Sequence, residues 1–93
     1  MGQKDRDLYR YIQDRLAKAE AGMPEALYDL GLLYSTGQGV ERDYVQAHKW
    51  FNLAAIRGVR RAQVDRHEVA RELDLASIAE AQRQARHWLT LHH

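Results

Sequence analysis

The sequence predicts an all-α protein, a short solenoid of about five helices, and three observations support that prediction. Helix-forming residues dominate, because Ala and Leu together supply 24 of the 93 residues whereas Val, Ile and Thr supply 10. Between the glycines, apolar residues recur every three or four positions, and no stretch alternates for long enough to form a strand. The motif Gly22-x-x-x-Ala26 recurs as Gly58-x-x-x-Ala62, a shift of 36 residues. Such a period, with two helices per unit, is typical of a helical solenoid.

The first two helices are expected over residues 5–21 and 24–36. Gly22 suits the end of the first helix, and Pro24 and Glu25 suit the first turn of the second. The apolar stripe of the first helix contains Leu8, Ile12, Leu16 and Ala19. The stripe of the second, which ends before Gly37, contains Ala26, Leu27, Leu30, Leu33 and Tyr34. Gly31 lies in the middle of that helix, where we expect it to allow close approach of another helix.

Three further helices are expected over residues 44–57, 60–72 and 75–90, after a loop over 37–42. Asp43 is a strong N-cap candidate for the third helix, and Gln46 could complete a capping box with it. Asp74 can cap the fifth helix in the same way. The inward residues of the third helix are expected to be Ala47, Trp50, Ala54 and Ala55. Those of the fourth and fifth are Ala62, Val69, Leu73, Ile78, Ala81, Ala85, Trp88 and Leu89.

Composition and charge exclude several classes of protein. A chain of 93 residues suits one small domain, and without cysteine it has no disulfide, thiolate metal site or cysteine nucleophile. A net charge of +1 gives no general attraction for nucleic acid or acidic membranes. The first 25 residues carry charges throughout, and no apolar run is long enough to span a bilayer, so a cytoplasmic location without membrane contact is expected.

No motif in the sequence predicts catalysis, a cofactor or a metal. Gly37-Gln-Gly39 lacks the strand, third glycine and lysine of a nucleotide-binding loop. The five histidines do not follow metal-ligand spacing, and neither Ser35 nor Ser77 lies in a nucleophile elbow. We therefore expect no catalytic residue, no metal ligand and no small-molecule cofactor.

The middle of the chain carries a more specific pattern. Residues 26–58 read ALYDLGLLYSTGQGVERDYVQAHKWFNLAAIRG, with Leu-Gly, Tyr, Gly-x-Gly-Val, Asp, Ala, Trp and Ala-Ala-x-x-Gly in order. This segment resembles a Sel1-like repeat, a longer-looped relative of the tetratricopeptide repeat. The resemblance implies a short right-handed α-solenoid of about five antiparallel helices, which acts by binding other proteins.

The flanks match the repeat less well, and they suggest how a single domain over 1–93 is organised. Residues 5–22 resemble the second helix of a preceding repeat and form an entry helix, and residues 23–58 form the complete repeat. Residues 59–91 are expected to be capping helices, because Arg66, His67 and Ala70 replace the Leu-Gly and Tyr signature. Residues 69–88 resemble the closing segment of bacterial members of the family.

The resemblance also predicts a binding groove, because the first helix of each pair lines the concave face in tetratricopeptide repeats. The groove is expected to bind a protein or peptide segment, with an exposed Tyr28 and Leu32 as its apolar contact. The predicted groove residues are Glu25, Tyr28, Leu32 and Ser35 on the second helix and Arg61, Val64, Glu68 and Arg71 on the fourth. Alternatively, Tyr28 or Leu32 packs beneath the fifth helix as part of the core.

Two other functions are also compatible with the sequence. A nucleic acid or an anionic ligand could bind the cluster of Arg57, Arg60 and Arg61, to which Arg66, Arg83 and Arg86 would add charge, although nearby carboxylates favour an ordinary solvated surface. A small regulatory subunit that self-associates weakly through incompletely capped ends is the third alternative.

Overall fold

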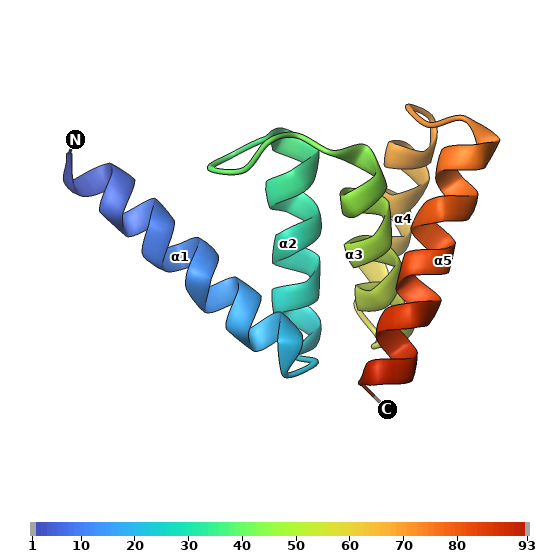
Figure 1. Ribbon diagram of the computed structural model, residues 1–93, viewed down its shortest axis with the longest axis horizontal. Coiled ribbons are helices and arrows are strands. Elements are labelled where there is room, and N and C mark those ends of the chain that lie inside the picture. Colours follow the sequence, from blue (N-terminus) through green and yellow to red (C-terminus); the bar gives the residue numbers. More distant parts are fainter. Residues whose placement is uncertain (1, 93) are drawn as a thin grey trace.

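Five α-helices make up the computed structural model, which describes residues 2–92 (Figure 1). They are α1 (Gln3–Glu20), α2 (Pro24–Thr36), α3 (Tyr44–Ile56), α4 (Arg60–Ala70) and α5 (Leu75–Leu91). Helices account for 79% of the structure, and residues 2–92 contain no strand. The all-α prediction is therefore confirmed, and each helix lies within two residues of its predicted range.

Helix α3 is the centre of the fold and packs against α2, α4 and α5, whereas α1 packs against α2. Figure 1 shows α2 to α5 standing side by side, with α1 leaning away so that its N-terminal end lies far from the other helices. The largest fully buried side chains are Leu27 and Leu30 of α2 and Phe51 and Leu53 of α3. Because α3 contacts three neighbours, it is buried beyond the single stripe that the sequence predicts.

Contacts between residues about one repeat apart hold the helix pairs together. Glu25 of α2 pairs with Arg61 of α4, 36 positions later, and Gln46 of α3 bonds Gln84 of α5 across 38 positions. Equivalent positions of successive helix pairs thus lie next to each other, as stacking of repeats requires. The sequence period of 36 therefore has a direct counterpart in the structure.

The N-caps at Asp43 and Asp74 are confirmed, but the predicted capping box is wrong. The carboxylates of Asp43 and Asp74 accept hydrogen bonds from the backbone N–H groups of Gln46 and Ser77, at 3.1 and 2.8 Å. The box fails because the Asp43 N–H already donates to the Tyr34 carbonyl at 2.9 Å. The Gln46 amide is therefore available to bond Gln84 instead.

Glycine is required at two positions where segments approach closely. A Cβ on Gly31 would lie 2.3 Å from Phe51 Cδ1, so the absence of a side chain lets α3 pack directly onto the backbone of α2. Gly39 has a φ of +75°, and a Cβ there would lie 2.5 Å from Ile12 Cδ1. The loop between α2 and α3 can therefore cover part of the apolar stripe of α1.

Among residues 2–92, no helix combines the length and the apolar character that crossing a membrane would require.

Candidate functional site

The structure places most of the predicted groove residues at the surface of α2 and α4. Leu32 is 38% exposed and Val64 is 64% exposed, although both side chains are apolar. The Arg61 guanidinium and the Glu25 carboxylate form a 2.5 Å ion pair that joins α4 to α2, and both side chains are more than half exposed. We call the exposed residues of this region the α2/α4 surface: Glu25, Leu32, Arg61, Val64, Glu68 and Arg71.

Tyr28 is buried, with 8% of its surface exposed, so the predicted exposed Tyr28–Leu32 pair is wrong. Its ring packs against Phe51, with centroids 5.5 Å apart, and the Arg61 guanidinium lies 4.3 Å from the ring centroid. Its hydroxyl donates a 2.5 Å hydrogen bond to Asp65 of α4. The alternative is therefore correct that Tyr28 belongs to the core, but these contacts come from α3 and α4 instead of α5. Tyr28 forms the floor of the α2/α4 surface.

Burial and the hydrogen bond to Asp65 both favour the protonated form of the Tyr28 phenol. Burial, and then the hydrogen bond to the Asp65 carboxylate, raise the pKa of the Tyr28 phenol above its usual value. The phenol therefore stays protonated and acts only as a donor to Asp65. This hydrogen bond and the Glu25–Arg61 ion pair both tie α2 to α4.

The remaining predicted residues make only local contacts. Glu68 and Arg71 pair with each other at 3.5 Å. Ser35 is half-buried, and its hydroxyl donates to the Leu32 carbonyl at 3.1 Å. Residues 2–92 contain no group of three or more histidine or acidic side chains that could hold a metal ion.

The arginine cluster is less available than its sequence suggests. The Arg57 guanidinium donates to the carbonyls of Gly22 and His92 at 3.5 and 3.2 Å and lies 5.7 Å from the centre of the Trp88 ring. Arg61 is paired with Glu25, as described above. Arg66 donates to Asn52 Oδ1 at 2.5 Å. Arg57, Arg61 and Arg66 therefore each bridge neighbouring segments of the fold, which leaves them less free to bind an anion than isolated surface arginines.

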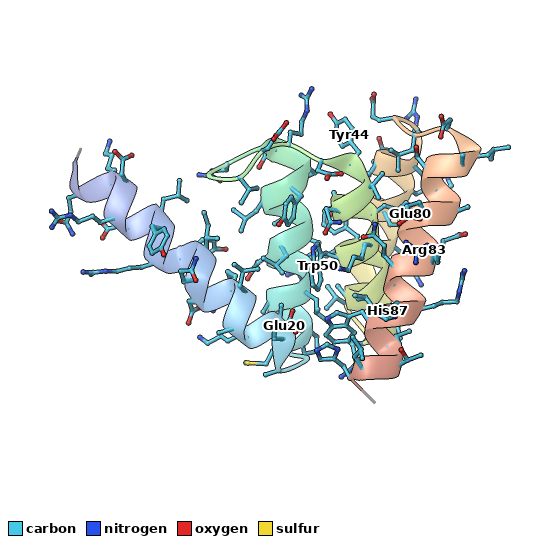
Figure 2. All side chains as sticks on the ribbon, in the orientation of Figure 1. Glu20, Tyr44, Trp50, Glu80, Arg83 and His87 are labelled. Carbon is cyan, nitrogen blue, oxygen red and sulfur yellow. The ribbon has the colours of Figure 1, made fainter. Side chains whose placement is uncertain are left out.

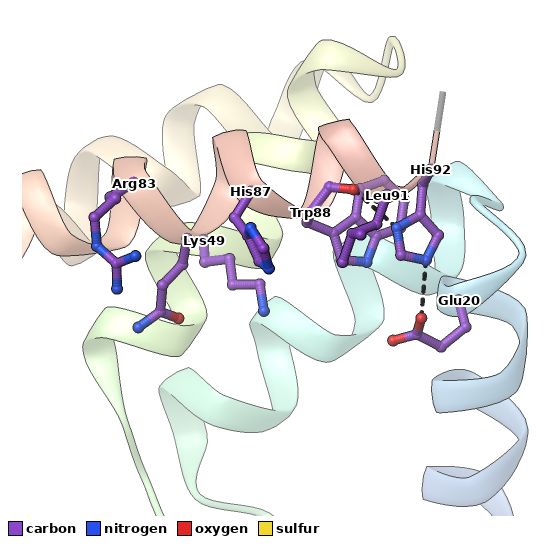
Figure 3. Close-up of a pocket in the computed structure, with 8 residues that line it drawn as sticks. Glu20, Lys49, Arg83, His87, Trp88, Leu91 and His92 are labelled. Carbon is purple, nitrogen blue, oxygen red and sulfur yellow. Dashed lines mark hydrogen bonds and ion pairs between the residues drawn. The ribbon is translucent and has the colours of Figure 1, made fainter.

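A second candidate site, which the sequence did not predict, is a pocket of about 360 Å³ between α3, α5 and the end of α1. Figure 2 shows Glu80, Arg83 and His87 along one side of α5, with Glu20 at the end of α1. In Figure 3 the Lys49 and His87 side chains reach toward the same opening, and Trp88 and Leu91 form its apolar end.

The charges around this pocket are compensated to different degrees. Arg83 binds Glu80 through two hydrogen bonds, of 2.9 and 2.5 Å, and with Gln84 it lowers the pKa of Glu80 to about 2. His92 Nε2 lies 2.9 Å from the Glu20 carboxylate, and the His92 ring stacks on Trp88. Lys49, in contrast, has no carboxylate partner among residues 2–92.

Lys49 lies against an aromatic ring instead of an anion. Its ammonium is 4.3 Å from the centroid of the Trp50 ring, and its side chain is half-buried. Burial lowers the pKa of Lys49, an effect that the charge of Glu20 partly opposes. No local spacing could have revealed this site, because its residues come from three helices that are far apart in the sequence.

The fold and the contacts between equivalent positions define a helical-repeat protein. Residues 24–59 match the family model of the Sel1 repeat. Residues 24–59 accordingly form one Sel1 repeat, which consists of α2, α3 and the turns that bound them. Sel1 repeats generally mediate protein–protein interaction and are not catalytic. Comparison with curated proteins and with solved structures found no match.

Proposed function

We propose that this protein is a non-catalytic adaptor that captures a segment of a partner protein on its α2/α4 surface. The observation that carries the proposal is the exposure of two aliphatic side chains, Leu32 and Val64, on the two helices that the repeat register assigns to the groove. The general role of Sel1 repeats in protein–protein interaction supports it. The predicted cytoplasmic location stays part of this proposal.

The physical properties of the α2/α4 surface suit such a role. When a partner covers exposed aliphatic groups, the burial contributes about 25 cal/mol of favourable binding free energy per Å² of apolar area. The Glu25–Arg61 ion pair is more than half exposed, so its two charges can change partners at little cost in free energy. The pairing of Tyr28 with Asp65 holds the floor of the surface rigid, which reduces the entropy lost on binding.

The test is a pull-down from the native lysate with three forms of the full chain. They are the wild type, the double variant Leu32→Asp/Val64→Asp, and Leu75→Asp as a matched control, since Leu75 is an exposed leucine at the start of α5. We expect the wild type and the Leu75 variant to retain the same proteins, and the double variant to lose them. Retention of those proteins by a double variant with unchanged thermal melting would refute the proposed surface.

A further inference from the structure

The pocket between α3, α5 and the end of α1 contains Lys49, a cation that forms no ion pair with a carboxylate of residues 2–92, although the more distant charge of Glu20 partly stabilises it. Lys49 is half-buried, and among residues 2–92 the group that lies against its ammonium is the Trp50 ring, at 4.3 Å from the centroid. The neighbouring cation, Arg83, is already neutralised by Glu80, and the Gln84 amide also donates to Glu80, at 2.8 Å. A partly buried ammonium that lacks a close ion pair gains most from a new anion, so an incoming anion would find its strongest interaction at Lys49.

The surroundings of Lys49 limit what that anion can be. Glu20 lines the same pocket and would repel a second negative charge, which disfavours a dianionic phosphate. Leu91, which is 65% exposed, and the small accessible part of the otherwise buried Trp88 give the pocket an apolar end. A volume of about 360 Å³ lies within the range of small-ligand sites.

We infer that this pocket binds a monoanionic carboxylate attached to an apolar group, with Lys49 holding the carboxylate and Trp88 and Leu91 contacting the apolar part. A free aliphatic acid and the C-terminal residue of a peptide both have this chemistry. The site is formed by other helices than the α2/α4 surface, so it goes beyond the proposed function and does not depend on it.

The geometry provides a direct optical measurement of binding. The chain has two tryptophans, of which Trp50 lies beneath the Lys49 ammonium and Trp88 lines the pocket. Ligand binding should therefore change the tryptophan fluorescence in a saturable way. The probes are 4-methylpentanoate, the peptide acetyl-Gly-Gly-Leu as its free acid, the same peptide as its C-terminal amide, and inorganic phosphate, each titrated to about 10 mM, the range suited to weak small ligands.

We expect saturation with at least one of the two carboxylates and affinities at least tenfold weaker for the amide and for phosphate. Tighter binding of the free peptide would identify a chain terminus as the ligand, whereas equal or tighter binding of 4-methylpentanoate would identify a free acid. An amide that binds as tightly as the acid, phosphate that binds more tightly, or no saturation with either carboxylate would overturn the inference.

Variants test the assignment of the residues. Lys49→Gln should weaken carboxylate binding at least tenfold, whereas Lys4→Gln, at an exposed lysine near the start of α1, should leave it unchanged. Leu91 is 65% exposed, so Leu91→Glu and Leu91→Gln should both fold. The added negative charge should make the Glu variant bind the carboxylate probes at least tenfold more weakly than the Gln variant does. Equal binding within either pair would contradict the assignment, and thermal melting of each variant verifies that it is folded.

Discussion

The replacement of Gly31 by alanine tests the central packing contact of the repeat. The added Cβ would lie 2.3, 2.4 and 2.9 Å from three atoms of the Phe51 ring, whereas ordinary van der Waals contacts begin at 3.4 Å. Phe51 is 1% exposed and its ring also packs against Tyr28, so the ring cannot move into solvent. The clash must therefore separate α2 from α3 or force the ring into a strained rotamer.

The size of the effect follows from two opposing contributions. Overpacking of a core costs about 1–3 kcal/mol, and a contact shorter than ordinary by about 1 Å belongs near the upper end of that range. The alanine returns about 1 kcal/mol through its better helix propensity. We therefore expect Gly31→Ala to lower the free energy of unfolding by about 1–2 kcal/mol, a decrease of about 4–16 °C in melting temperature for a domain of this size.

Urea unfolding followed by circular dichroism measures this change. The matched control is the same substitution in a Phe51→Ala background, where the obstructing ring is absent and the alanine should be neutral or stabilising. The coupling between the two positions should be at least about 1 kcal/mol. A single Gly31→Ala variant that is more stable than the wild type would refute the packing described for α2 and α3.

Three further measurements test the burial of Trp50, the titration of His48 and the N-cap of α3. Trp50→Ala should cost about 3–5 kcal/mol, because Trp50 is 5% exposed, and unchanged urea unfolding would show that the α3 register is wrong. Burial, and then the charge of Arg66, lower the pKa of His48 from 6.5, so the unfolded chain binds the proton more tightly than the folded one. The free energy of unfolding should therefore decrease as the pH falls below about 6.5, by at most about 1.4 kcal/mol per pH unit from this group. Urea titrations at pH 8 and 5.5 measure the decrease, and His48→Leu should remove the part that His48 contributes. Asp43→Ala should cost about 1 kcal/mol through loss of the α3 N-cap, whereas Glu41→Ala in the preceding loop should have little effect on thermal melting.

Much of the fold could be predicted because its signals are local in the sequence. Apolar spacing, the N-cap residues Asp43 and Asp74 and the terminating glycines each act within a few residues of a helix end. The end of α4 was less predictable. Leu73 continues the apolar pattern, but the N–H groups of residues 71–73 bond carbonyls three residues earlier, so the chain turns there and α4 ends at Ala70.

The α2/α4 surface and the pocket at Lys49 were harder to predict because both depend on how the helices face each other. Helical periodicity assigns Tyr28 to the side of α2 away from Leu30 and Tyr34, but it does not reveal that Arg61 and Asp65 of α4 cover that position. His48 and Phe51 were missed because α3 is enclosed by three helices, so residues outside its predicted stripe are buried too. The pocket at Lys49 exists only once α1, α3 and α5 are assembled.

The most direct test of the central claim is site-specific photo-crosslinking on the α2/α4 surface in living cells. A photo-reactive amino acid would replace Leu32 or Val64 in the full chain, and Leu75 in the control, since all three side chains are exposed. We expect the same partner protein to be crosslinked from positions 32 and 64 and not from position 75. A partner crosslinked from position 75 but from neither of the other two would contradict this expectation.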